Sequence, residues 1–309
     1  MTGINAIVLL LFATIFMPPL SLGVLRKMKA RLQNRIGAPI MQPIFDLARL
    51  FSKSETVSQD TSWIFRITAV ANFTIMILLA VFVPWLSFKA PLVGCSDLFL
   101  IVYLFGLSRF FTVLAALDAG SAFGGFGASR EVTLALLVEP AVILCLASLG
   151  ACGQTSDLSE VLSTGNTHLA NHGALWIMAG SGLFLSSLVE LSRMPADDPT
   201  THLELTMVHE AMILENSAAN LALVEYAHMI KLAVLLGLSG QCLLHALPAY
   251  WSLAPELQVV SCIASVFVLT MVVALIESTA VKLRWTKLPE FIAYPVALSL
   301  LCILVAIGK

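Results

Sequence analysis

Residues 257–281 read LQVVSCIASVFVLTMVVALIESTAV, and Glu277 is the single charged residue in this run. A helix of about 20 apolar residues crosses the ~30 Å hydrocarbon core of a bilayer, so the run is long enough to span a membrane. Lipid offers no hydrogen bonds to the backbone, and a helix satisfies its own polar groups internally. The stretch therefore predicts a transmembrane helix and decides the fold class.

Seven further runs have the same character. With the first run they give eight expected spans, at 4–25, 64–86, 97–117, 131–150, 174–193, 219–247, 257–281 and 288–307. Of the 309 residues 59% are hydrophobic and only 12% charged, whereas about a quarter of a soluble domain is charged. We expect an all-α polytopic membrane protein, one integral membrane domain over residues 1–309, with amphipathic helices on its cytoplasmic side. Pro18, Pro19 and Pro140 should kink or break their helices.

Lysine and arginine are distributed unevenly between the connections. If the N-terminus faces outward, 13 of the 17 basic residues fall in inward segments and two, Lys89 and Lys309, in outward ones. Cytoplasmic connections are enriched in basic residues, so both termini are expected to face the periplasm or exterior. The inward residues are Arg26, Lys27, Lys29, Arg31, Arg35, Arg49, Lys53, Arg66, Arg130, Arg193, Lys282, Arg284 and Lys287.

The first inward connection, residues 26–62, contains an amphipathic segment. Ile44, Leu47 and Phe51 recur at helical spacing after Pro43, a residue suited to a first helical turn. We expect an interfacial helix here. In the second inward connection, residues 118–130, four glycines indicate a flexible turn with close backbone approach.

The third inward connection, residues 193–219, combines prolines with acidic residues. Thr201 and Glu204 form a capping box, which predicts a helix starting near His202. Asp197 and Asp198 precede that helix start, where negative charge is favourable. The helix is expected at the membrane edge, presenting polar groups to a partner.

Ionisable residues recur inside the spans, where each costs several kcal/mol unless it is paired or hydrated. They are Arg109, Glu139, Glu190, Glu225, His228, Lys231 and Glu277, with Asp118 and Glu131 at span ends. Glu131 and Glu139 share one helix face, and for Lys231 we expect Glu139 or Glu225 as the counter-ion. The set fits a proton relay through hydrated carboxylates; structural ion pairs between helices are the alternative.

Three stretches carry a resemblance to a known family. They are RLQNRIGAP (residues 31–39), GASRE (127–131) continuing to Val138-Glu139-Pro140, and ADDPTTHLELTMVHE (196–210) preceded by Glu190 and Arg193. They resemble the membrane family shared by respiratory complex I, in its eight-helix arm-docking subunit, and the group 4 membrane-bound nickel–iron hydrogenases. The wording of the third stretch is similar to the formate hydrogenlyase subunit 4 and hydrogenase-4 component C branch.

The resemblance implies a coupling subunit without a redox centre of its own. A nickel–iron large subunit and an iron–sulfur small subunit would dock here, and antiporter-like membrane subunits would lie alongside. The implied docking and junction residues are Arg31, Arg35, Arg130, Arg193, Asp197, Asp198, His202, Glu204, His209 and Glu210. The implied relay residues are Glu131, Glu139, Glu190, Glu225, His228, Lys231 and Glu277.

Other functions remain open at this point. A quinone-site subunit of a complex I-type NADH:quinone oxidoreductase, a stand-alone ion transporter and a plain helical scaffold all fit eight spans. The six cysteines form no CxxC pair, so we expect neither a metal nor another cofactor in this chain. No basic patch interleaved with aromatic residues indicates nucleic-acid binding.

Overall fold

The computed structural model describes residues 3–58, 60–86, 96–163, 172–197 and 207–307, with side chains from residue 9 onward. Within these ranges the chain is helical and contains no strand. The elements are α1 (Gly3–Leu32), α2 (Gln42–Phe51), α3 (Trp63–Phe82), α4 (Leu98–Asp118), α5 (Ala122–Gly153), α6 (Leu158–Val161), α7 (Gly173–Glu190), α8 (His209–Ile213), α9 (Ala218–His245), α10 (Pro248–Trp251), α11 (Pro255–Thr279), η1 (Trp285–Lys287) and α12 (Leu288–Ile307).

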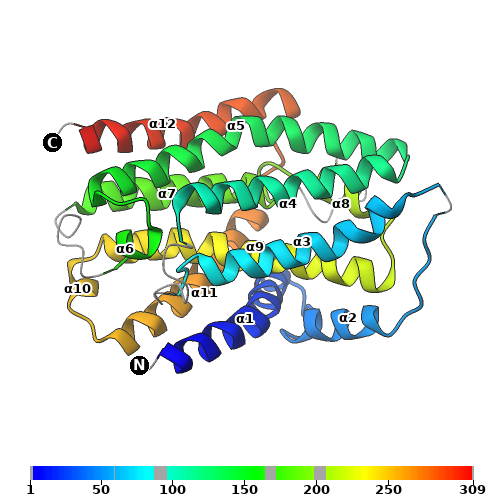
Figure 1. Cartoon of the computed structure of the whole chain (residues 1–309), viewed down its shortest axis with the longest axis horizontal. Coiled ribbons are helices and arrows are strands. Elements are labelled where there is room, and N and C mark those ends of the chain that lie inside the picture. Colours follow the sequence, from blue (N-terminus) through cyan, green and yellow to red (C-terminus); the bar gives the residue numbers. More distant parts are fainter. Residues whose placement is uncertain (1–2, 59, 87–95, 164–171, 198–206, 308–309) are drawn as a thin grey trace.

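Eight of the described helices are long and apolar enough to cross a membrane, as the sequence predicts. They are α1, α3, α4, α5, α7, α9, α11 and α12, and they lie roughly side by side (Figure 1). Helix α9 is at the centre, against α1, α3, α7 and α11, while α12 and α5 form one edge (Figure 1). The protein is therefore a multi-pass, all-α membrane protein.

The amphipathic helix is confirmed as α2, with Pro43 in its first turn. Its buried residues are Pro43 and Leu47, and Leu47 packs with residues of α1 and α9. Phe51, expected on the same apolar face, is half exposed. The apolar face that meets the bundle is thus narrower than predicted, and the aromatic ring of Phe51 is available to a lipid surface.

The prediction of a turn over residues 118–130 is wrong for most of that segment. Gly120 lies in a turn at φ +65°, but α5 already begins at Ala122. A Cβ on Gly124 would lie 2.6 Å from the Ala116 carbonyl oxygen, and one on Gly127 would lie 2.8 Å from that of Val208. The close backbone approach expected at these glycines is confirmed, but it occurs within a helix and not in a flexible turn. The prolines at positions 18, 19 and 140 lie inside continuous helices and break neither.

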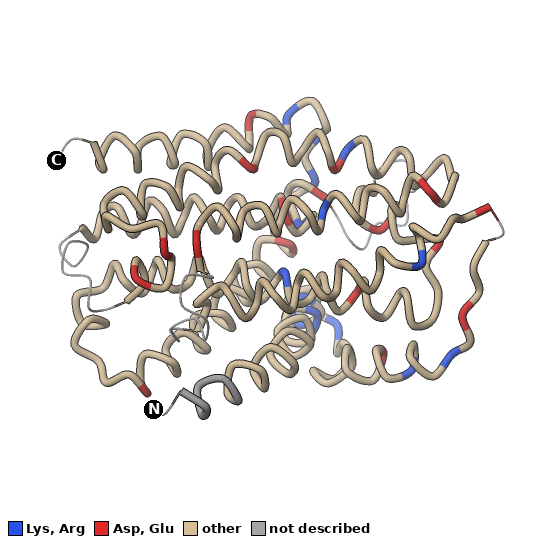
Figure 2. The backbone as a smooth tube through the Cα atoms, viewed as in Figure 1, with Lys and Arg blue, Asp and Glu red and all other residues tan. Residues whose placement is uncertain are grey.

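The two ends of the bundle differ in charge. Figure 2 shows the described Lys and Arg residues in the half that carries α2 and α8, with acidic residues alone at the other end. That other end contains the largest apolar cluster, which includes Trp85 and Trp176. Gly237 of α9 admits Trp85, because a Cβ there would lie 2.9 Å from the indole ring.

Candidate functional site

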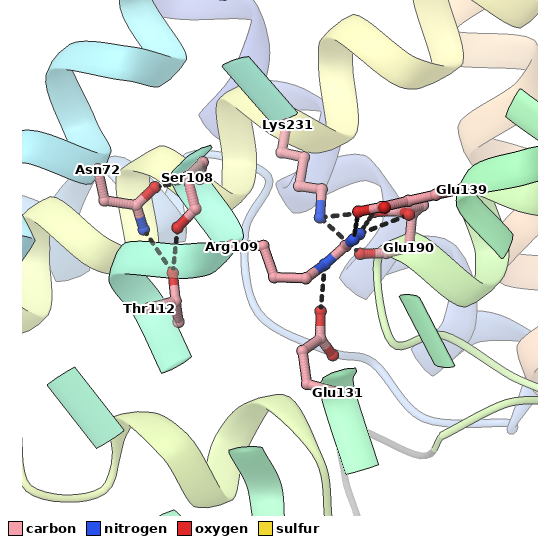
Figure 3. Close-up of polar contacts among 8 residues, drawn as sticks. All are labelled: Asn72, Ser108, Arg109, Thr112, Glu131, Glu139, Glu190 and Lys231. Carbon is pink, nitrogen blue, oxygen red and sulfur yellow. Dashed lines mark hydrogen bonds and ion pairs between the residues drawn. The ribbon is translucent and has the colours of Figure 1, made fainter. Parts of the chain in front are cut away.

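An ion-pair cluster, buried except for its edge at Glu139, lies where α4, α5, α7 and α9 meet, and Arg109 of α4 is its centre (Figure 3). The guanidinium Nη2 is 2.5 Å from Glu190 Oε2, and Nη1 pairs with Glu139. The third contact joins Nε to Glu131 Oε1 at 3.4 Å. Lys231 Nζ lies 2.9 Å from Glu190 Oε2 and donates a hydrogen bond to the Glu190 carbonyl oxygen. We call these five residues the Arg109 cluster.

The Arg109 cluster has more acids than bases. Its three carboxylates face two cations, which leaves one negative charge unless one carboxyl group holds a proton (Figure 3). Groups this close titrate as a set, so one proton can be shared among them. The arrangement is therefore chemically able to store and pass a proton.

A small cavity, the cluster cavity, adjoins this site and holds about 30 Å³. Asn72 of α3 lines it and is linked to α4, because Ser108 donates to its amide oxygen and its Nδ2 donates to Thr112 Oγ1 at 3.1 Å. Polar walls and this volume suit at least one bound water. This group of hydroxyl and amide side chains was missed by the sequence reasoning, since nothing local distinguishes it from ordinary polar residues in a span.

A second cavity of about 150 Å³, the loop-side cavity, is lined in part by residues 191–193 and 197 after α7 and by residues 209 and 210 of α8. Its charged lining residues are Arg26, Lys29, Arg193, Asp197, Glu210, Glu225 and Glu277. Glu277 of α11 is held between Arg193 Nη1 at 3.2 Å and Lys29 Nζ at 3.1 Å. Polar walls and this volume make the cavity suitable for several waters.

Asp197 lines the loop-side cavity and holds two segments of the chain together. Its Oδ1 is 2.5 Å from Lys282 Nζ, and its Oδ2 accepts the Val208 N–H at 2.8 Å. One carboxylate thus ties the connection before α8 to the connection between α11 and η1. A helix from His202 is expected here, but residues 198–206, with Asp198, His202 and Glu204, lie outside the described residues. Residues 207 and 208 are not helical, and α8 is described from His209.

Burial shifts two titratable groups at the start of α8. Desolvation, with Lys231 and Arg193 nearby, lowers the pKa of His209 to about 4. Desolvation and the neighbouring Glu225 raise the pKa of the Glu210 carboxyl group. Burial thus disfavours the charged form of both side chains.

The predicted residues fall into three places. Glu131, Glu139, Glu190 and Lys231 belong to the Arg109 cluster, and the two acids of α5 meet the same guanidinium, as their shared face predicts. Glu225, His228 and Glu277 line the loop-side cavity with Arg193, Asp197, His209 and Glu210. Arg31, Arg35 and Arg130 lie apart from both cavities.

Arg31 lies in the last turn of α1 and Arg35 in the connection that follows it, and both are exposed. Lys27 Nζ donates to the carbonyl oxygens of Ile36 and Gly37, at 2.8 and 3.2 Å, and Gly37 has φ +66°. That connection is thereby fastened onto α1. Arg130 lies elsewhere, over the rings of Phe126 and Trp285.

One predicted pairing is wrong. The counter-ion of Lys231 is Glu190, not Glu139 or Glu225. Glu190 ends α7 and pairs with Arg109 as well, and Arg193 pairs with Glu277. The central role of Arg109 was missed, although its signal was present: a guanidinium in an apolar span needs carboxylates.

A bundle of eight apolar helices around buried ion pairs defines a multi-pass membrane subunit. A family model described as "NADH dehydrogenase" matches residues 4–307, so this chain belongs to that family. The resemblance drawn from the three sequence stretches is thereby confirmed.

Individual relatives give a finer picture. The chain is 32% identical to "Hydrogenase-4 component C" of Escherichia coli over 72% of its own length and 70% of the relative's. It is 27% identical to "Formate hydrogenlyase subunit 4" of the same organism over 91% of both chains. "NADH-ubiquinone oxidoreductase chain 1" of Triticum aestivum is 28% identical over 73% of this chain and 71% of that one.

One solved structure shares the fold along nearly the whole chain. A chain of the membrane-bound sulfane sulfur reductase, described as an archaeal respiratory membrane complex, matches with a TM-score of 0.81 and 17% identity. The match covers 98% of both chains. That structure shows the fold alone, whereas the family match over residues 4–307 and the curated relatives make this chain a membrane subunit of the respiratory type. Among its described residues, no three His, Cys, Asp or Glu side chains are grouped to hold a metal.

Proposed function

We propose that this chain is the membrane-anchoring and coupling subunit of a group 4 nickel–iron hydrogenase or formate hydrogenlyase-like complex. It docks a hydrophilic redox arm and relays redox events in that arm to proton-transfer carboxylates inside the membrane. One observation carries the proposal. Charged groups follow one another from Asp197, which lines the loop-side cavity, to Glu139 in the Arg109 cluster.

Docking of the redox arm is supported by the shape and charge of the basic half of the bundle. Arg31 at the end of α1 and Arg35 in the following connection, which Lys27 fastens onto α1, are exposed, and this suits the docking of an acidic surface. In this proposal the partners carry the nickel–iron centre and the iron–sulfur clusters, and this chain carries none. The basic half faces the cytoplasm of a bacterial or archaeal cell, which leaves both termini outside.

Proton transfer to a neighbouring membrane subunit is supported by the position of Glu139. Its side chain is 41% exposed, although α5 carries it at membrane depth and its partner Arg109 is only 8% exposed. A carboxylate at this depth does not persist against lipid tails. A neighbouring membrane subunit of the antiporter-like kind therefore covers it and receives protons from it.

The central test is Glu139→Gln in the assembled complex. The amide keeps the shape but cannot ionise, so assembly should be retained while coupled turnover or proton movement falls at least tenfold. The measurements are subunit composition and proton movement in sealed vesicles. Glu256→Gln, an exposed acid at the first turn of α11, is the matched control. Unchanged turnover together with unchanged proton flux in Glu139→Gln refutes the relay.

Docking is tested by Arg35→Ala. Loss of an exposed guanidinium in the fastened connection should reduce co-purification of the soluble subunits several-fold, and more so at high salt, because the contact is electrostatic. Arg66→Ala, exposed at the first turn of α3, serves as the control. A full complement of soluble subunits on Arg35→Ala would contradict the docking role.

A quinone-site subunit of a complex I-type enzyme is the second candidate, favoured by the NADH-ubiquinone oxidoreductase relatives. The two functions are separated by composition and substrate. A purified complex that contains nickel and leaves quinone unreduced supports the first, and one that reduces quinone without nickel supports the second.

A further inference from the structure

The cluster cavity and the loop-side cavity share two lining residues, His209 of α8 and His228 of α9. Their rings are stacked, with centroids 4.3 Å apart and planes 26° apart. Every other described lining residue belongs to one cavity or the other. The imidazole pair is therefore the wall between the two polar spaces.

The stacked arrangement closes this wall to protons. Ring nitrogens donate and accept in the plane of the ring, so two nearly parallel rings cannot hydrogen-bond to each other. Within the described part of the chain no group hydrogen-bonds His209 Nε2, which is buried. That nitrogen is thus free to accept a proton or a water as soon as the ring turns.

Charged groups surround the pair on both sides. On the loop side they are Arg26, Lys29, Arg193, Asp197, Glu210, Glu225 and Glu277. On the cluster side they are Arg109, Glu131, Glu190 and Lys231. Lys231 and Arg193, together with burial, keep His209 neutral at rest, with a pKa of about 4. A neutral pair can stack, whereas a proton on either ring meets these cations and weakens the stacked state.

We propose that the His209–His228 pair is a proton-operated gate between the loop-side cavity and the cluster cavity. A proton from water or from Glu210 binds a ring nitrogen of His209, and the cationic ring turns away from Lys231 and out of the stack. It passes the proton to His228, which releases one from its other nitrogen to water in the cluster cavity and so to Glu131 or Glu190. Both rings end neutral, and the stack re-forms.

This inference rests on the proposed function, because the gate serves the relay. The first test replaces one ring at a time in the assembled complex, as His209→Phe and His228→Phe. Phenylalanine can stack but carries no proton, so proton movement in sealed vesicles should fall at least tenfold with the subunits still assembled. His245→Phe is the matched control, since His245 is also a buried histidine of α9 but lines neither cavity.

A second test separates proton transfer from packing. His228→Ala leaves space for a small molecule, and added imidazole should restore proton movement in proportion to its concentration. Pyrazole has the same size but is far less basic, so it should restore nothing. Rescue by both compounds would show that the ring only fills space, and it would overturn the gate. His228→Ser leaves nearly the same space and provides the same comparison if the alanine variant does not assemble.

The outcomes distinguish failure of the gate from failure of the proposed relay on which it rests. Loss of proton movement in Glu139→Gln with full movement in both phenylalanine variants would leave the relay standing and refute the gate. Full movement in all three variants would refute both. Loss in all three, with rescue of His228→Ala by imidazole alone, supports both.

Discussion

The two halves of this bundle bury histidine in opposite ways. In the half with α2 and α8, His209 and His228 stack on each other between two charged cavities. In the other half, His245 stacks on Trp176 with ring centroids 4.7 Å apart, and its two nitrogens lie 2.8 and 3.0 Å from the carbonyl oxygens of Gln241 and Leu162. Among the described residues, His209 Nε2 has no hydrogen-bond partner, whereas each nitrogen of His245 has a carbonyl oxygen within hydrogen-bonding distance.

The contrast extends to the surroundings. The end that contains His245 is held by apolar packing around Trp85 and Trp176, both fully buried. The end that contains the histidine pair is held by ion pairs centred on Arg109 and Glu277. Apolar packing has one good arrangement, whereas charged groups joined by water have several of similar energy. The same bundle thus combines a fixed half with a half suited to change.

The largest expected effects on stability come from variants that disrupt one half of the bundle at a time. Arg109→Ala removes the centre of the cluster and leaves buried carboxylates with Lys231 alone, which should destabilise the protein by about 3–5 kcal/mol. Trp176→Ala should cost about the same, ~3–5 kcal/mol, through the cavity it leaves. Denaturant unfolding of the detergent-solubilised protein measures both.

The two variants should differ in function although they match in stability. The folded fraction of Trp176→Ala should still move protons in the complex, whereas that of Arg109→Ala should not. Arg109→Lys, which keeps one charge but not the three-way contact, should recover stability more than proton movement. Equal loss of proton movement in Trp176→Ala and Arg109→Ala would erase the distinction between the two halves.

Much of the fold could be predicted from the sequence because each span is identified by its own run of apolar residues. About 20 apolar residues suffice to mark a membrane helix, and Pro43 followed by apolar residues at helical spacing suffices to mark α2. The pairings could not be predicted, because they depend on how distant helices pack. Lys231 meets Glu190 because α7 packs closely against α9. The close packing also shows at Gly180 of α7, where a Cβ would lie 2.9 Å from Leu243 of α9.

Glycine was the main source of error for the local structure. The residues around Gly124 and Gly127 predict a turn on propensity alone, yet they are helical. Their value lies in contacts with Ala116 and Val208, which only the folded chain reveals. Arg109 illustrates the same limit for the site, since its sequence context shows a need for carboxylates without showing which ones.

A smaller expected effect is the pH dependence of stability that His209 causes, and it sharpens the contrast with His245. The pKa of His209 falls from 6.5 unfolded to about 4 folded, so the unfolded state binds the proton first as the pH drops. Stability should decrease from pH 6.5 toward pH 4, by up to about 3 kcal/mol. The raised pKa of Glu210 acts with the opposite sign and offsets part of this loss.

Unfolding curves at several pH values check this expectation. His209→Phe removes the titrating group, so its stability should change less between pH 6.5 and pH 4 than that of the unchanged protein. The difference between the two profiles isolates His209 from the carboxyl groups that titrate in the same range. Parallel profiles would show that His209 is not held neutral by its surroundings, and the comparison with His245 would lose its basis.

The smallest expected effects come from a feature that both halves share. Asp118 accepts the backbone N–H groups of Ser62 and Phe65, at 2.9 and 3.2 Å, where α3 begins. At the opposite end, Asp97 accepts the N–H of Phe99 at 2.8 Å and caps α4. An aspartate at a helix start satisfies backbone donors, and replacing it by alanine costs about 1 kcal/mol.

Asp118→Ala and Asp97→Ala should therefore lower the free energy of unfolding by similar amounts, and neither should alter proton movement. Asp118 is the more informative of the two, because it is an acid at the charged end of a span and so resembles a relay residue in sequence. Its carboxylate is already committed to two backbone donors, which leaves it little capacity to exchange protons. Loss of proton movement in Asp118→Ala, with none in Asp97→Ala, would extend the proton-transfer region beyond the Arg109 cluster to the start of α3.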